Sequence, residues 1–227
     1  MYIILFILLS LLLAAMIYAS YSIQLGVYIQ CLCRNKHAGK VLALTFDDGA
    51  DPVATPLVLD VLKKYGVPAT FFIIGAKAEK YPELVKRIVA EGHEIGNHSY
   101  SHHGMFPLLS SRAMVIDLQR GERILHKLSG KEIIYFRPPF GVTNPTIAKA
   151  VSIMGYTTIG WSIRSLDTLN KEREWVRKRV LKRLHNGGVI LLHDNRPAAD
   201  QLLEMILKDV TRKGYKIIGI NELFNKK

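Results

Sequence analysis

The segment VLALTFDDG, at residues 41–49, begins with six mostly apolar residues and ends with two adjacent aspartates and a glycine. A short apolar run of this length predicts a strand that is buried on both faces, as strands of parallel sheets are. Asp-Gly is also common in ordinary turns, so the aspartates alone do not identify a site. The segment therefore predicts a first parallel strand with Asp47 and Asp48 at its carboxyl end.

The chain that follows repeats this pattern and alternates it with helical patterns. We expect strands at 41–46, 69–75, 93–98, 133–136, 157–163, 188–194 and 216–220, and helices at 53–64, 81–92, 111–128, 144–154, 171–185 and 199–213. Alternation at this spacing predicts a parallel sheet with helical crossovers. Since no glycine-rich phosphate-binding turn follows the first strand, a barrel is favoured over an open sheet. The predicted fold class is α/β, a distorted or incomplete (β/α) barrel of about seven parallel strands.

The amino-terminal segment has a different composition from the rest. The first charged side chain is Arg34, and residues 2–19 are apolar except for Ser10. Roughly 20 apolar residues span a bilayer, so we expect a transmembrane helix or uncleaved signal anchor within residues 1–33, followed by one domain at 34–227. A cleaved signal peptide is the alternative, but the basic region that begins such peptides is missing. The length of the run disfavours a buried core helix.

The 31 Lys and Arg residues exceed the 19 Asp and Glu residues, which gives a formal net charge of +12, all of it within residues 34–227. A basic balance favours acidic partners, such as nucleic acid, a membrane surface or an anionic envelope polymer. No aromatic-basic motif or zinc-finger spacing supports nucleic acid, so we expect no such partner. The basic helix at 171–185 is interpreted as a solvated outer face, with contact to an anionic polymer as the alternative.

Unusual polar residues stand at or just beyond the ends of the expected strands. They are Asp47, Asp48, His98, Arg137, Trp161, Asp167 and His193. In a β/α barrel the carboxyl ends of the strands form one face, and active sites lie there. We therefore expect these residues to converge in one cleft.

Two histidines in this set have the spacing of a metal site. His98 and His102 are four residues apart, so a helical turn would place both imidazoles on one side. An adjacent carboxylate would complete a set that leaves positions open for water and substrate. Because the last cysteine is Cys33, a metal in the main domain must take nitrogen and oxygen ligands. Of Asp47 and Asp48, one can bind the metal while the other faces its water.

Two further residues have a functional and an ordinary interpretation. Arg137 lies in the rigid loop RPPFG, where it can hold a carboxylate or form a structural salt bridge. His193 ends the apolar run VILLH, where it can be a core histidine or a general acid facing the cleft.

Together these motifs resemble the polysaccharide deacetylases of carbohydrate esterase family 4, the NodB homology domain, over about residues 40–224. All five motifs of that family can be placed: TFDDG at 45–49, HSYSH at 98–102, RPPFG at 137–141, SLDT at 165–168 and LLH at 191–193. The fourth motif departs from the family, because Thr168 replaces the usual Trp and Arg164 stands where many relatives have Asp. These two departures affect a substrate subsite and leave the other motifs intact.

The resemblance implies a role for each matching residue. Asp47 would be the general base, His193 the general acid, and Arg137, backed by Asp167, would orient the base. The metal ligands would be Asp48, His98 and His102. On the substrate side it implies a backbone N–H near Phe140 for the oxyanion and Leu191 in the acetyl pocket. Trp161 is expected to pack against this site, with sugar stacking as the alternative.

The function so implied is a membrane-anchored, metal-dependent N-deacetylase. Its substrate would be a glycan that contains N-acetylglucosamine, with peptidoglycan expected first and chitin-type oligomers second. One divalent ion is implied, with zinc expected first and cobalt or manganese as alternatives. The competing hypotheses are a non-catalytic glycan-binding module of the same fold and an amidohydrolase that acts on another amide. An envelope substrate places the domain outside the cytoplasm, although the basic residues at 34–40 favour the opposite orientation.

Overall fold

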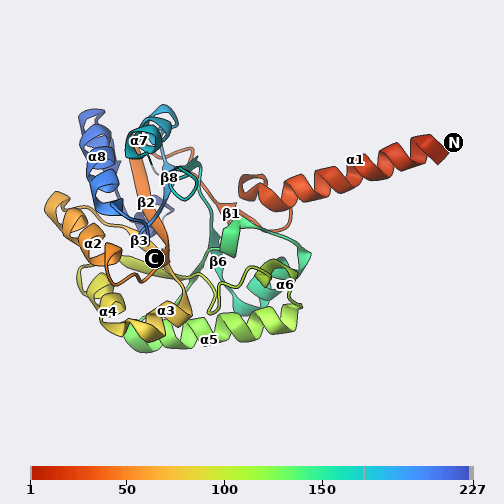
Figure 1. Cartoon of the computed structure of the whole chain (residues 1–227), viewed down its shortest axis with the longest axis horizontal. Helices are drawn as coiled ribbons and strands as arrows, with labels where there is room; N and C mark the ends of the chain where they lie inside the picture. Colours follow the sequence, from red (N-terminus) through yellow and green to blue (C-terminus); the bar gives the residue numbers. More distant parts are fainter. Residues whose placement is uncertain (1, 171, 225–227) are drawn as a thin grey trace.

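A computed structural model describes residues 2–170 and 172–224 of the chain (Figure 1). The strands are β1 (Cys31–Leu32), β2 (Val41–Gly49), β3 (Thr70–Ile73), β4 (Glu94–Asn97), β5 (Tyr135–Phe136), β6 (Thr157–Ile159), β7 (Ile163–Arg164), β8 (Gly188–His193) and β9 (Lys216–Ile217). The α-helices are α1 (Tyr2–Tyr21), α2 (Ala54–Tyr65), α3 (Gly75–Lys80), α4 (Pro82–Ala90), α5 (Ser111–Ser129), α6 (Pro145–Met154), α7 (Arg173–Lys182), α8 (Ala199–Arg212) and α9 (Ile220–Leu223).

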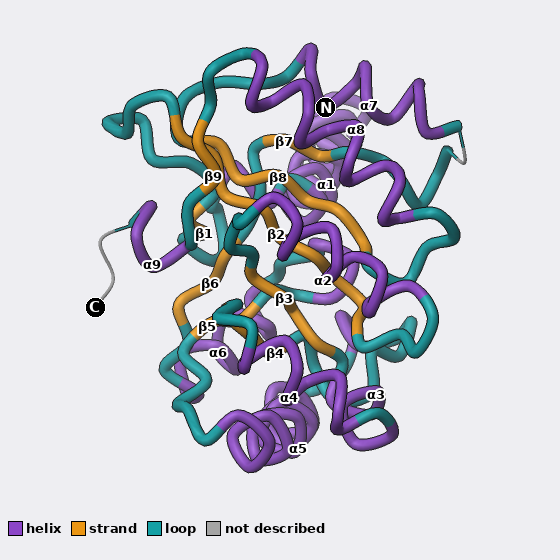
Figure 2. Tube along the Cα trace, turned by 90° about the vertical axis from the view of Figure 1, so that its left-hand side faces the viewer, coloured by secondary structure: helices purple, strands orange, loops and turns teal. Residues whose placement is uncertain are grey.

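All of these strands belong to one parallel sheet, which is curled into an incomplete barrel. Their order is β1-β6-β5-β4-β3-β2-β8-β7, and β9 pairs with the start of β2. Figures 1 and 2 show the strands in the middle with the helices arranged around them. The predicted fold class is confirmed, and the carboxyl ends of the strands share one face.

The structure differs from the sequence-based expectation at a few short elements. The strand expected at 157–163 is divided into β6 and β7 by residues 160–162. Within this interval the carbonyl of Gly160 accepts a hydrogen bond from Nη2 of Arg137. Helices α3 and α9 were not expected, since elements of four to six residues show no measurable periodicity.

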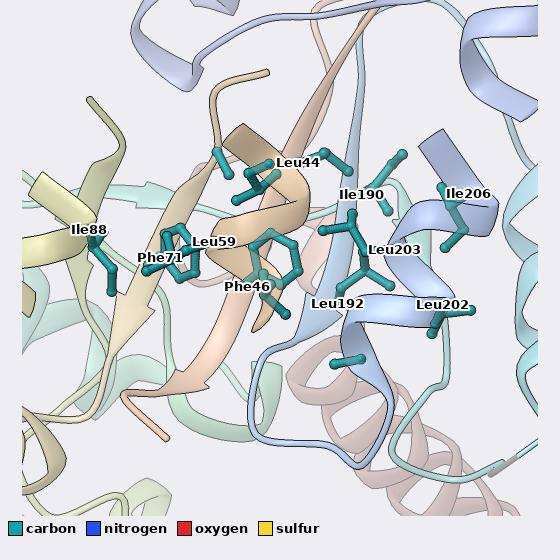
Figure 3. Close-up of a cluster of buried hydrophobic side chains, with 14 of the residues drawn as sticks. Leu44, Phe46, Leu59, Phe71, Ile88, Ile190, Leu192, Leu202, Leu203 and Ile206 are labelled. Atoms are coloured by element: carbon teal, nitrogen blue, oxygen red, sulfur yellow. The ribbon is translucent and has the colours of Figure 1, made fainter. Parts of the chain in front are cut away.

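The largest part of the core lies between the sheet and the helices that cover its outer face. Phe46 on β2, Phe71 on β3 and Leu192 on β8 are fully buried and pack against apolar side chains of α2 and α8, such as Leu59 and Leu203 (Figure 3). Both faces of β2 are buried, as its continuous apolar sequence predicts. This packing fixes the strands whose ends carry the candidate site.

Helix α1 projects away from the domain (Figure 1), and of its side chains only Ala19 is buried. Its mean hydropathy is 2.7, and it is long and apolar enough to cross a membrane; a signal sequence has the same properties. The residues at 22–33 lie beyond this helix. They pack on the domain and supply β1, the edge strand beside β6.

Candidate functional site

The expected cleft is present at the carboxyl ends of the strands and has a volume of about 250 Å³. Eight of the ten residues singled out from the sequence line it: Asp47, Asp48, His98, His102, Phe140, Trp161, Leu191 and His193. The other two, Arg137 and Asp167, lie behind this lining and are hydrogen-bonded to residues that form it. Residues far apart in the sequence therefore meet at one place, as the strand-end argument predicts.

Three of these residues form a cluster that can hold a metal ion. One ligand atom from each of Asp48, His98 and His102 lies within 4.8 Å of the others. The Oδ1 atom of Asp48 is 3.6 Å from Nε2 of His98 and 3.3 Å from Nε2 of His102. The Nδ1 atom of His98 is 2.8 Å from the carbonyl oxygen of Arg137, which fixes the ring with Nε2 toward the cluster. Two imidazole nitrogens and a carboxylate oxygen suit zinc or a related divalent ion.

The backbone around this cluster is not the helical turn that the spacing suggested. His98 follows β4, and the segment after it is a loop in which Ser99 and His102 have φ angles of +66° and +45°. Asp48 also has a positive φ, +69°. Non-glycine residues rarely adopt this left-handed conformation, and such residues gather at functional sites. The helical-turn interpretation was therefore wrong, although both imidazoles still reach Asp48.

The loop at residues 98–103, which carries His98 and His102 and is called the histidine loop below, is held by a residue that the sequence did not single out. The carboxylate of Asp117, on α5, accepts hydrogen bonds from the backbone N–H of Tyr100 at 2.7 Å and of Ser101 at 3.1 Å. The hydroxyl oxygen of Ser99 accepts a further bond from the N–H of His102 at 3.0 Å. An acidic residue on a surface helix carries no signal for this contact, so only the structure identifies it.

The charges in the cluster suit a metal ion. Burial raises the pKa of Asp48, but the hydrogen bond to His98 and the charges of the neighbouring imidazoles outweigh this and hold the pKa well below its usual range. Burial and the proximity of His98 lower the pKa of His102 to about 4. At neutral pH the cluster therefore presents a carboxylate and a neutral imidazole, which are the protonation states that metal binding requires.

Asp47 is held by a buried arginine beside this cluster. Nη1 of Arg137 donates to Oδ1 of Asp47 at 2.7 Å, and both side chains are buried. The other oxygen, Oδ2, is 3.9 Å from Nε2 of His98 and so faces the cluster. Asp48 thus belongs to the cluster, while Asp47 lies beside it and is held by Arg137.

Four hydrogen bonds from its guanidinium hold Arg137 in place. Besides Asp47, Nη1 donates to the hydroxyl of Thr45 at 2.8 Å, Nε donates to the carbonyl of Ile159 at 3.0 Å, and Nη2 donates to the carbonyl of Gly160 at 2.8 Å. Thr45 was not singled out, although a residue two positions before Asp47 on a strand shares its face. The arginine is therefore fixed by acceptors on β2 and at the end of β6.

Asp167 holds His193 rather than Arg137, contrary to the pairing that the resemblance implied. Its Oδ1 lies 2.8 Å from Nδ1 of His193, and its Oδ2 accepts the backbone N–H of His193 at 2.8 Å. Burial lowers the pKa of His193, but the hydrogen bond and charge of Asp167, with the charges of Asp47 and Asp48, outweigh it and raise that pKa above its ordinary value. Because Nδ1 is bonded to Asp167, Nε2 is the nitrogen left for the cleft.

Aromatic rings form the wall of the cleft. The ring of Phe140, half exposed, lies 4.7 Å from that of His102, measured between centroids. Trp161 is buried and packs against Leu191. Gly141 has a φ of +69°, and a Cβ there would collide with the Trp161 ring, so the position requires glycine.

The two residues that depart from the family motifs also line this cleft. The guanidinium carbon of Arg164 lies 5.7 Å from the centroid of the Trp161 ring, and its side chain is exposed. Thr168 leaves a smaller side chain where a tryptophan is usual. The lining of the cleft therefore includes the positive charge of Arg164 and the small side chain of Thr168.

Comparison with known proteins gives a consistent result. The family model described as polysaccharide deacetylase matches residues 34–159. A peptidoglycan-N-acetylglucosamine deacetylase of Bacillus cereus is 38% identical over 83% of this chain and 90% of its own length. The peptidoglycan-N-acetylmuramic acid deacetylase PdaA of Bacillus subtilis is 34% identical over 83% of this chain and 73% of its own. A family 4 acetyl xylan esterase of Clostridium thermocellum, solved with a cobalt ion, has a TM-score of 0.75 and 32% identity, and the match covers 82% of this chain and 91% of that one.

Proposed function

The chain belongs to the polysaccharide deacetylase family, and we propose that it is a metal-dependent hydrolase that removes N-acetyl groups from the glycan of peptidoglycan. The observation that carries this proposal is the convergence of the Asp48, His98 and His102 cluster with two separately held groups for proton transfer, Asp47 and His193. A module that only binds glycan needs no such pair of proton-transfer groups.

One divalent ion is the cofactor that the cluster suits. Asp48, His98 and His102 would hold it, and the protonation states of Asp48 and His102 at neutral pH support this. When bound, the ion supplies a Lewis acid that polarises the acetamide carbonyl and makes water more acidic. We propose zinc first, because the donor set is typical of zinc, with cobalt as an alternative that a related structure contains.

Asp47 has the geometry of a general base. Arg137 occupies its Oδ1, so Oδ2 is the oxygen free to accept a proton from water in the cleft. Arg137 acts here as a positioning residue, since its guanidinium is turned toward Asp47 and three other acceptors behind the cleft. A fixed orientation of the base reduces the reorganisation needed for proton transfer.

His193 has the geometry of a general acid. Asp167 holds Nδ1, which directs the proton on Nε2 into the cleft, where the amine leaves. The raised pKa of His193 keeps a larger fraction of its imidazole protonated near neutral pH. Across the cleft, a backbone N–H near Phe140 would stabilise the oxyanion, and Leu191, which packs against Trp161, would contact the acetyl methyl.

The proposed peptidoglycan substrate is based on the names of the relatives. Their named substrates are N-acetylglucosamine and N-acetylmuramic acid in peptidoglycan, and N-acetylglucosamine remains our first choice. We also propose that α1 anchors the protein in the membrane with the domain on the outer side, since a wall glycan is found only there. Contact of the basic helix α7 with an anionic envelope polymer remains a secondary proposal.

Acetate release tests this function directly. The full chain in detergent is incubated with peptidoglycan and with chitotetraose, with and without a chelator, and zinc is then added back. We expect release that the chelator abolishes and zinc restores, while the matched variant Asp47→Asn releases almost none. No acetate from a broad panel of N-acetylated glycans, even with added zinc, would refute the proposal.

A further inference from the structure

The chain that follows α1 is part of the wall of the cleft. Ile23 is only 3% exposed and packs with Trp161 and Leu191, both of which line the cleft. A Cβ placed on Gly160 would lie 3.4 Å from Cδ1 of Ile23, so this side chain lies directly on the Gly160 backbone. The carbonyl of Gly160 is one of the acceptors that fix Arg137. The segment just beyond the apolar helix therefore packs against Trp161 and against the backbone of Gly160, which holds Arg137.

The end of α1 is itself attached to the domain. The carbonyl of Ser20 accepts a hydrogen bond from the N–H of Thr143 at 2.9 Å, and Ala19 is buried. The hydroxyl of Tyr28 donates back to the carbonyl of Met16 at 3.3 Å. The chain then enters the sheet as β1 beside β6, close to where α1 leaves the domain (Figure 1). The helix and the domain are thus joined by contacts rather than by a free tether.

The position of a bilayer on α1 follows from its length and its tyrosines. Twenty residues of helix span about 30 Å, which equals the hydrocarbon core. Tyr18 and Tyr21, in the last turn, are 67% and 71% exposed, and tyrosine is enriched where a span meets water. Leu25 and Val27, just beyond, are exposed apolar side chains that suit the same interface. With α1 inserted in a bilayer, the membrane boundary lies at the turn that contacts Thr143.

The metal cluster lies close to that boundary. Thr143 is three residues beyond Phe140, a separation of at most about 10 Å even if the backbone is fully extended. The rings of Phe140 and His102 are 4.7 Å apart. Through these contacts the cluster lies within about 20 Å of the bilayer surface.

We propose that the docked span holds the cleft at the membrane surface, so that the preferred substrate is an N-acetylhexosamine chain that is itself attached to a membrane lipid. This inference rests on the proposed function and on the membrane insertion of α1. A flexible tether would let the domain search the wall, whereas contacts from Ser20 to Ile23 keep the cleft beside the lipid. Both partners are then confined to one surface, which raises their effective concentration.

The test increases the distance between the span and the domain, and it does so by separating Ser20 from Thr143. Twenty residues of a rigid helical repeat, (EAAAK)₄, are inserted between Tyr21 and Ser22, which lifts the domain by about 30 Å. A flexible Gly-Ser insertion of the same length is the matched control, because it lets the domain return to the surface. Each full-length protein is reconstituted in vesicles with chitotetraose coupled to a phospholipid headgroup, and in parallel with free chitotetraose. The measured quantity is the ratio of the two rates of acetate release.

We expect the rigid insertion to lower this ratio by roughly tenfold or more and the flexible insertion to lower it less. An unchanged ratio in the rigid variant would overturn this inference alone. If wild-type protein releases acetate from peptidoglycan but from neither of these two substrates, this inference fails alone. If it releases acetate from no N-acetylated glycan, the proposed function fails and this inference fails with it. Should the rigid variant be inactive on free chitotetraose, a two-repeat insertion, which moves the domain by about 15 Å, supplies the same comparison.

Discussion

The buried pair of Arg137 and Asp47 permits a quantitative test of how the general base is held. Arg137→Met removes the guanidinium and keeps an unbranched side chain in a fully buried position. It leaves the carboxylate of Asp47 buried without its ionic partner and also removes the donors to Thr45, Ile159 and Gly160. Asp47→Asn removes the opposite charge with little change of shape.

The size of the effect follows from these contacts. Breaking a buried ion pair by removing one partner costs about 3–5 kcal/mol, because the remaining charge is uncompensated. We therefore expect Arg137→Met to lower the free energy of unfolding by about that amount, and Asp47→Asn to lower it as well. In the double variant no charge is left unpaired at this position. Its cost should be smaller than the sum of the single costs by at least about 2 kcal/mol.

The assay is denaturant unfolding of the full chain in detergent, followed by tryptophan fluorescence, with chelator present so that metal binding does not contribute. Arg120→Met is the matched control, since Arg120 pairs with Glu79 at the exposed surface and such a pair is worth about 1 kcal/mol or less. If the costs of Arg137→Met and Asp47→Asn add to within about 0.5 kcal/mol, the two side chains are not coupled and the positioning role is refuted.

Three further predictions concern the site. Asp48→Ala should weaken zinc binding by at least roughly 100-fold, whereas Asp47→Asn should keep zinc affinity within about tenfold of wild type and lower kcat by about 10² or more. Calorimetry measures the zinc affinity of each variant, and acetate release measures its kcat. Equal loss of zinc affinity in both variants would contradict the proposed roles of the two aspartates. Asp167→Asn removes the partner that raises the pKa of His193, and a general acid is lost as pH rises through its pKa, so the alkaline limb of the kcat profile should move to lower pH; an unmoved limb would contradict this role. Arg164→Ala should slow release from oligosaccharides that carry carboxylates more than release from neutral chitotetraose, and equal effects on both would show that this cation does not select the substrate.

The sequence predicted the face of the barrel on which the site lies, because strand ends converge whatever the exact boundaries of the strands are. It did not predict which partner each group takes. Asp167 lies thirty residues after Arg137 and twenty-six before His193 in sequence, and neither separation indicates that the carboxylate contacts His193. The conformation of the histidine loop was also hidden, since left-handed residues and the distant support of Asp117 leave no periodic pattern. The packing of Ile23 against Trp161 has no signal in the sequence either, because a single apolar residue in an uncharged segment does not indicate its partner.

The acceptors of Arg137 come from β2 and from the end of β6, while the arginine itself follows β5. These contacts join residues 90 positions apart in the chain for Asp47 and 22 apart for Ile159. Contacts of high sequence separation carry a loop-closure cost that must be offset when they form. A nascent or partly folded chain that lacks these contacts has the Asp47 carboxylate without the arginine that orients it. Hydrolytic competence therefore requires the closed sheet as well as the site residues, because only the closed sheet brings the arginine to this carboxylate.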